Sequence, residues 1–139
     1  DASTPEKLLE MEQVKTLFGT NHKVVVGLNG ICWFLDKEQV RHILRVLYDW
    51  VDEGSILFFT AFDNENPTEE FNLFVNMYKN INQPFYTVTK NEFKEMIIPW
   101  KIEEPGFLSL EEWIGEESIT TEKSTRSMGG SIFAGFLKK

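Results

Sequence analysis

Two short and almost continuously apolar segments stand out in the first half of the chain. Residues 23–28 are apolar after the first position and β-branched at their centre, and residues 55–62 are apolar and rich in phenylalanine. This length and composition are typical of strands that are covered on both faces of a sheet. We therefore expect two buried strands, at residues 23–29 and 54–62.

The residues between these segments have helical periodicity. Asp36 and Gln39 have the spacing of a capping box, and apolar residues follow at intervals of three or four: Val40, Ile43, Leu44, Leu47 and Val51. A strand, a helix and a second strand with short connections make the right-handed crossover of a parallel sheet. The pattern therefore predicts two parallel strands joined by a helix over residues 37–52.

The remaining elements are predicted from local start and stop signals. Thr4 and Pro5 begin a helix that Gly19 ends, Asn66 caps a second helix, and Thr89 caps a short third helix. Strands are expected at residues 101–103, 107–110 and 131–137, with a mobile connection over 115–130. The chain is thus expected to be a single α/β domain over residues 1–139, with parallel strands, flanking helices and an antiparallel C-terminal edge.

Composition narrows the class of protein. The chain has 139 residues, 42% of them hydrophobic, which is enough for a core without disulfides, and it has one cysteine. The formal charge of −8 repels phosphate, so we expect no nucleic-acid partner. No apolar run approaches the roughly 20 residues that a membrane span requires, and the first residues lack the features of a secretory signal. We expect a cytoplasmic protein that does not contact membranes.

Common catalytic and metal-binding motifs are absent from the sequence. The two histidines and the cysteine are not at ligand spacing, so no metal is expected. There is no nucleophile elbow, no phosphate-binding loop and no dinucleotide-binding glycine motif. Hydrolase, kinase and dehydrogenase functions are therefore disfavoured, and no catalytic residue is assigned.

A candidate site follows instead from topology, because open parallel sheets bind ligands beyond the carboxyl ends of their strands. After the first strand, Asn29 offers a donor and an acceptor, Gly30 permits close approach, and Trp33 offers a flat face for a heterocycle or cation. The alternative, which composition alone favours, is a structural turn with a tryptophan in the core. Cys32 has no basic neighbour in sequence and is expected to be a buried thiol.

The second strand ends in a second candidate segment, residues 60–63. Asp63 can orient a substrate or begin a turn, and the turn is the better supported of the two. Aromatic residues near the expected cleft, Phe62, Tyr86 and Trp113, can shape a pocket or hold a cation, with core packing as the alternative for each.

Five segments, in this order and spacing, resemble a known family: residues 1–5 (DASTP), 24–36 with VVV and ICWFLD, 52–57 (DEGSIL), 86–93 (YTVTKNEF), and 104–107 (EPGF) with Trp113. They are similar to the C-terminal half of class I S-adenosylmethionine-dependent methyltransferases, in a family whose substrates are largely unassigned. The resemblance spans nearly the whole chain. It departs at Trp33, where the family usually has histidine.

The resemblance implies a partial Rossmann-like fold, the cofactor S-adenosylmethionine and a small-molecule methyl acceptor. It places cofactor contacts at Asn29, Gly30, Cys32 and Trp33. Acceptor contacts are expected at the second tip and the late aromatics: Thr60, Phe62, Asp63, Tyr86 and Trp113. The family's glycine-rich cofactor loop and its ribose-binding acid have no counterpart here, so the chain is similar to half of such an enzyme.

A second hypothesis belongs to another class of protein. A methyltransferase-like chain without the cofactor loop can serve as a non-catalytic binding or scaffolding module. Half a sheet leaves a free strand edge and uncovered apolar surface, and such surfaces bind partners. The expected partner is the missing N-terminal half or a second copy of the chain in a homodimer.

Overall fold

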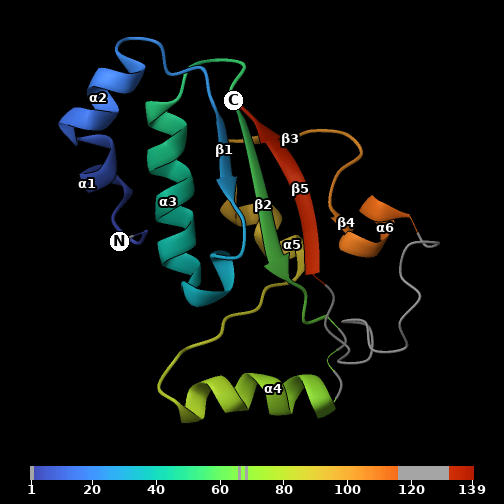
Figure 1. The fold of residues 1–139 in the computed structure, drawn as a ribbon. Coiled ribbons are helices and arrows are strands. Elements are labelled where there is room, and N and C mark those ends of the chain that lie inside the picture. Colours follow the sequence, from blue (N-terminus) through green and yellow to red (C-terminus); the bar gives the residue numbers. More distant parts are fainter. Residues whose placement is uncertain (1, 66, 68, 116–131) are drawn as a thin grey trace.

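The structure, a computed structural model, describes residues 2–65, 67, 69–115 and 132–139. A five-stranded sheet forms the centre of this part, in the order β1-β2-β5-β3, with β4 also paired to β5 (Figure 1). The first two strands run parallel, and β5 runs antiparallel to each of its partners. The strands are β1 (Val25–Leu28), β2 (Ile56–Phe62), β3 (Lys101–Ile102), β4 (Leu108–Ser109) and β5 (Ile132–Lys138).

The predicted crossover is confirmed. Helix α3 (Lys37–Trp50) joins β1 to β2, and Asp36 and Gln39 form the expected capping box at its start. Its apolar face is buried against the sheet. The two strands pair in parallel with Val25 opposite Ile56. The α/β architecture with an antiparallel C-terminal edge therefore follows the pattern of the sequence.

Strand β1 is not covered on both faces, and the expectation of a buried strand is wrong there. It pairs only with β2 within the described residues, so it lies at the edge of the sheet. Val25 is 74% exposed, whereas Val26 and Leu28 are partly buried against the core. The apolar run indicated a strand with two neighbours, but only one of them is present among the described residues.

The N-terminal helix is divided into two. Helix α1 (Pro5–Leu9) ends before Met11, whose extended backbone separates it from α2 (Glu12–Phe18). The expected single helix over this span is therefore wrong. The break lets both short helices turn apolar side chains, Leu8 and Leu9 from one and Val14 and Phe18 from the other, toward β1.

The later part of the chain contains one unexpected helix. Thr89 caps α5 (Lys90–Met96) as predicted, but the strand expected at 107–110 is shorter and leads directly into α6 (Leu110–Ile114). Ser109 and Glu112 form a capping box that the apolar pattern of residues 107–110 concealed. The predicted cap at Asn66 and most of the expected connection over 115–130 lie outside the described residues.

Two apolar clusters hold these elements together. Phe59 lies at the centre of the larger one, stacked on Phe93 with 4.2 Å between ring centroids. The smaller cluster joins Phe62 and Phe85 to Phe71 of α4 (Glu69–Asn80). Figure 1 shows α4 crossing beyond the carboxyl ends of β1 and β2. None of the described helices combines the length and the apolarity that a membrane span requires.

Candidate functional site at the carboxyl ends of the parallel strands

The tips of the two parallel strands are joined by Thr60. Its hydroxyl accepts a hydrogen bond from the Gly30 backbone amide (2.9 Å) and donates one to Oδ1 of Asn29 (3.1 Å). Thr60 is buried, whereas Asn29 is exposed. The two predicted segments therefore form one site, with the turn at Gly30 (φ +73°) held against the end of β2.

The 3₁₀ helix η1 (Cys32–Phe34) follows this turn and directs Trp33 into an aromatic group. The Trp33 ring lies 4.9 Å from Phe62 and 6.4 Å from Phe85, measured between ring centroids. Trp33 is partly buried. One part of its side chain packs against the cluster of Phe62, Phe71 and Phe85, and the rest stays accessible. Trp33 thus packs against a core cluster and keeps accessible surface at the strand tips, and its contact with a ligand stays a prediction.

Residues 85–88 form hydrogen bonds to the segments that follow both strands. The sequence pattern did not predict these bonds. The amide of Tyr86 donates to the Trp33 carbonyl (2.8 Å), and the amide of Val88 donates to the Phe62 carbonyl (2.9 Å). This extended segment has no periodic pattern, so only its flanking cap at Thr89 could be predicted. It fixes Tyr86 beside the end of β1 and gives the site a third wall.

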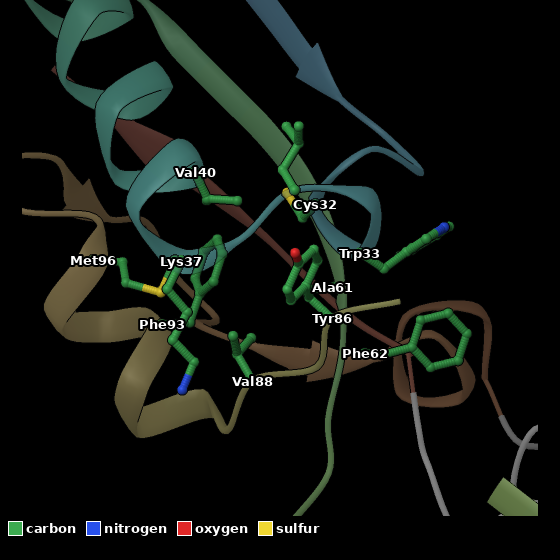
Figure 2. Close-up of a pocket in the computed structure, with 11 residues that line it drawn as sticks. Cys32, Trp33, Lys37, Val40, Ala61, Phe62, Tyr86, Val88, Phe93 and Met96 are labelled. Atoms are coloured by element: carbon green, nitrogen blue, oxygen red, sulfur yellow. The ribbon is translucent and has the colours of Figure 1, made fainter. Parts of the chain in front are cut away.

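A small cavity lies beneath these walls (Figure 2). It is lined by Cys32 and Trp33 on one side and by Tyr86, Phe93 and Met96 on another. Its volume is about 10 Å³, which is about the space of one water molecule. An adenosyl group does not fit inside this cavity.

Cys32 is buried at the wall of this cavity, with its Sγ 4.0 Å from the Leu28 carbonyl. Burial raises the pKa of its thiol to about 12, since the charged thiolate loses its solvation there. The side chain is therefore a neutral thiol near pH 7. This agrees with the expectation of a buried thiol and excludes Cys32 as a nucleophile in this conformation.

One charged pair at the site was not anticipated. Lys37, which also lines the cavity, forms an ion pair with Glu92 of α5, with 2.6 Å between Nζ and Oε1. The hydrogen bond from Lys37 lowers the pKa of Glu92 below its ordinary value, and the backbone amide of Thr89 at the N-cap adds to the effect. The pair holds the starts of α3 and α5 together at the surface.

Two predicted residues take other positions. Asp63 is buried and its Oδ1 accepts from the Glu65 amide (3.0 Å), as in a turn, although it remains at the end of β2. Trp113, in α6, packs against β5: its indole N–H donates to the Ala134 carbonyl and its ring packs on Phe136. These contacts of Trp113 are with β5 and not with Trp33, Phe62 or Tyr86. The described residues contain no cluster of three potential metal ligands.

The chain matches a known protein family along its whole length. A profile of S-adenosyl methyltransferases, Methyltransf_19, matches residues 1–139. The chain belongs to this family. No curated protein matches this S-adenosyl methyltransferase family member.

Two solved structures share the fold of this family member. A DUF574 family protein from Streptomyces avermitilis is 19% identical with a TM-score of 0.79, and the match covers 100% of this chain and 53% of that protein. A methyltransferase candidate from Thermobifida fusca is 18% identical with a TM-score of 0.80, covering 100% and 52%. The chain thus spans about half the length of these proteins.

Proposed function

We propose that this chain is the C-terminal, substrate-side portion of an S-adenosylmethionine-dependent methyltransferase that acts on a small molecule. Membership of the S-adenosyl methyltransferase family supports this activity. The observation that carries the site is the Thr60 hydroxyl, which joins the tips of β1 and β2 into one surface. Ligands of open parallel sheets bind at such tips.

The residues at the tips suit the charged end of S-adenosylmethionine. The Thr60 hydroxyl donates a hydrogen bond to Oδ1 of Asn29. The exposed side chain of Asn29 therefore presents its N–H₂ group as a donor for a carboxylate. The partly exposed Trp33 face and the Tyr86 ring are aromatic surfaces of the kind that attract a cation. Gly30 has a positive φ of +73°, and a Cβ at this position would lie 3.4 Å from the Trp33 ring, so the turn brings the backbone against this aromatic face.

When bound, S-adenosylmethionine would supply an electrophilic methyl carbon, with the neutral thioether of S-adenosylhomocysteine as its leaving group. The chain's own residues then have three tasks, which are to bind, to align and to exclude water. Phe62 and Phe85 make the base of the site apolar, and residues 85–88 hold Tyr86 at its side. No acid or base with a suitably shifted pKa is required for these tasks.

The small volume of the cavity supports a cofactor site that this chain shares with the other half of the fold. About 10 Å³ of space leaves no room for adenosine inside the cavity at the strand tips. The chain also covers only about half of the proteins that share its fold. We infer that Asn29, Gly30 and Trp33 contact the methionine end, and that the adenosine end is held by residues of the other half of the fold. Acceptor contacts are then assigned to Thr60, Phe62, Asp63 and Tyr86, and to Trp113 of α6, whose indole N–H donates to Ala134.

Titration of the chain with S-adenosylhomocysteine, followed by backbone amide NMR, tests this function because the method detects millimolar binding. Shifts are expected at residues 29–33, 60–63 and 85–88. Asn29→Ala should reduce the affinity by about tenfold, which corresponds to the loss of one charge-assisted hydrogen bond. Asn91→Ala, a change at another exposed asparagine, should leave the affinity unchanged.

The non-catalytic module is the second candidate, and the free edge of β1 favours it. It predicts no amide shifts at the strand tips at millimolar ligand, for the chain alone or when it is joined to the other half of the fold. That result would contradict the proposed methyltransferase function. Shifts confined to the tips and removed by Asn29→Ala would contradict the non-catalytic module.

A further inference from the structure

Two contacts attach α5 and the segment before it to the chain around the start of α3. At one end, the Tyr86 amide donates to the Trp33 carbonyl (2.8 Å). At the other end, Nζ of Lys37 lies 2.6 Å from Oε1 of Glu92. Figure 2 shows the Lys37 side chain extending from the start of α3 toward α5. Two points of attachment fix the orientation of a segment, whereas a single point leaves it free to rotate.

Glu92 serves both this attachment and the start of its own helix. Its Oε1 accepts from Lys37, and its Oε2 accepts from the Thr89 amide (2.9 Å). The Glu92 amide donates in return to the Thr89 hydroxyl (3.1 Å), which completes a capping box. The hydrogen bond from Lys37 is the main cause of the lowered pKa of Glu92, so the carboxylate is charged near pH 7. One side chain therefore joins the end of residues 85–88 to α3.

The attached segment borders the base of the candidate site. Lys37, Tyr86 and Val88 all line the small cavity beneath the strand tips. Between the two attached ends, the Val88 amide donates to the Phe62 carbonyl (2.9 Å). The position of Tyr86 beside the end of β1 therefore depends on both ends of the segment, and the ion pair with Glu92 holds the end that follows Val88.

We propose that Lys37 and Glu92 are positioning residues of the candidate site. Their ion pair holds residues 85–88 in place and thereby sets where the Tyr86 ring lies beside the strand tips. Neither residue is assigned a contact with cofactor or acceptor, and the pair acts through Thr89 and the segment before it. The inference rests on the proposed function for the role of Tyr86, but the placement itself is measured without any ligand.

Amide hydrogen exchange followed by NMR tests the placement. Both side chains of the pair are partly exposed, and ion pairs of this kind contribute modestly. Lys37→Met should therefore accelerate exchange at Tyr86 and Val88 by about two- to fivefold. Lys37→Arg keeps the positive charge and should exchange like the wild type. Glu92→Gln removes the negative charge but keeps a capping-box side chain, so it should accelerate exchange at the same two amides and not within α5.

Arg41→Met is the matched control on the same helix. The Arg41 side chain is 46% exposed, close to the 45% of Lys37, but neither Arg41 nor its ion-pair partner Glu38 lines the cavity. Exchange at Tyr86 and Val88 should be unchanged in this variant. Unchanged exchange in Lys37→Met, or an equal acceleration in Lys37→Arg, would overturn the proposal. Equal acceleration across all strands would also overturn it, since it would show a loss of global stability.

A second measurement separates this inference from the proposed function. S-adenosylhomocysteine is titrated into the wild type and into Lys37→Met, with the backbone amide shifts as the readout. The proposal predicts a smaller shift at Tyr86 in the variant, whereas the shifts at residues 29–31 persist. Equal shifts at Tyr86 in the two proteins would overturn the positioning role alone. The absence of shifts at the strand tips of the wild type would contradict the proposed function and remove the role of the pair with it.

Discussion

At the scale of single residues, Thr60 does the most to define the site. Its hydroxyl is both acceptor and donor between β2 and the turn after β1. Thr60→Val keeps the shape but leaves the Gly30 amide without its partner, so we expect a loss of about 1–2 kcal/mol in the free energy of unfolding. Urea unfolding measures this loss, and Thr60→Ser, which retains the hydroxyl, is the control. Equal stability of the valine variant and the wild type would contradict this role.

Cys32 gives a second prediction at this scale. Its thiol is 7% exposed and has a pKa raised to about 12, so the native chain should resist alkylation by iodoacetamide at pH 8. The same thiol should react readily in concentrated urea. Mass spectrometry after timed quenching measures both rates. Rapid alkylation of the native chain would show that the cavity wall opens.

The same shift predicts how stability depends on pH. The ordinary pKa of the thiol is 9.0, and the folded value is about 12. Between these values the unfolded chain loses the proton and the folded chain keeps it. The contribution of Cys32 to the free energy of unfolding is therefore fully present below pH 9 and decreases as the pH rises above 9. The slope is about 1.4 kcal/mol per pH unit. Unfolding of the wild type and Cys32→Ala at pH 8 and pH 10 isolates the effect, since other groups titrate in both proteins. An equal loss of unfolding free energy between pH 8 and pH 10 in the wild type and in Cys32→Ala would contradict this role of the Cys32 thiol.

At the scale of elements, the start of α3 fixes the crossover. Asp36 accepts from the Gln39 amide (2.8 Å), and Gln39 Oε1 accepts from the Asp36 amide (2.9 Å). Asp36→Ala removes one half of this box and should lower stability by about 1 kcal/mol. Asp36→Asn keeps an acceptor at the N-cap and should retain most of the stability. Chemical denaturation compares them, and a difference close to zero would show that the cap is dispensable.

The elements also show what sequence reasoning can and cannot reach. The crossover was predictable because the capping box and the apolar spacing of α3 are local signals. The edge position of β1 was not, because the number of strands that pair with it is a property of the whole sheet, and the exposure of Val25 depends on what covers that face of the sheet. The hydrogen bonds from the amides of Tyr86 and Val88 to Trp33 and Phe62 were not predictable either, because they join distant segments and have no periodic signature. The position of Trp113 was not predictable, because it depends on how α6 packs against β5, a contact between segments distant in sequence.

At the scale of the whole molecule, the two apolar clusters imply two levels of stability. Phe59 is completely buried and contacts rings from α5 and β5, so it links the sheet to its covering helix. Phe71 packs α4 against Phe62 at the strand tips, and Phe74 and Tyr78 of the same helix pack on Phe85. Elements with fewer buried contacts open at lower free energy than the core. The wall that α4 contributes to the site is therefore expected to open separately from the sheet.

Two phenylalanine truncations test this hierarchy. Phe59→Ala should cost about 3–5 kcal/mol, comparable to the total stability of many domains, and accelerate amide exchange throughout the chain. Phe71→Ala removes the same ring, but its effect should be confined mainly to residues 69–80, since α4 can detach while β2 stays paired on both sides. Hydrogen exchange followed by mass spectrometry resolves these segments. If Phe71→Ala accelerated exchange in residues 56–62 as much as Phe59→Ala does, the two clusters would form a single cooperative unit, and access to the strand tips would require unfolding of the whole chain.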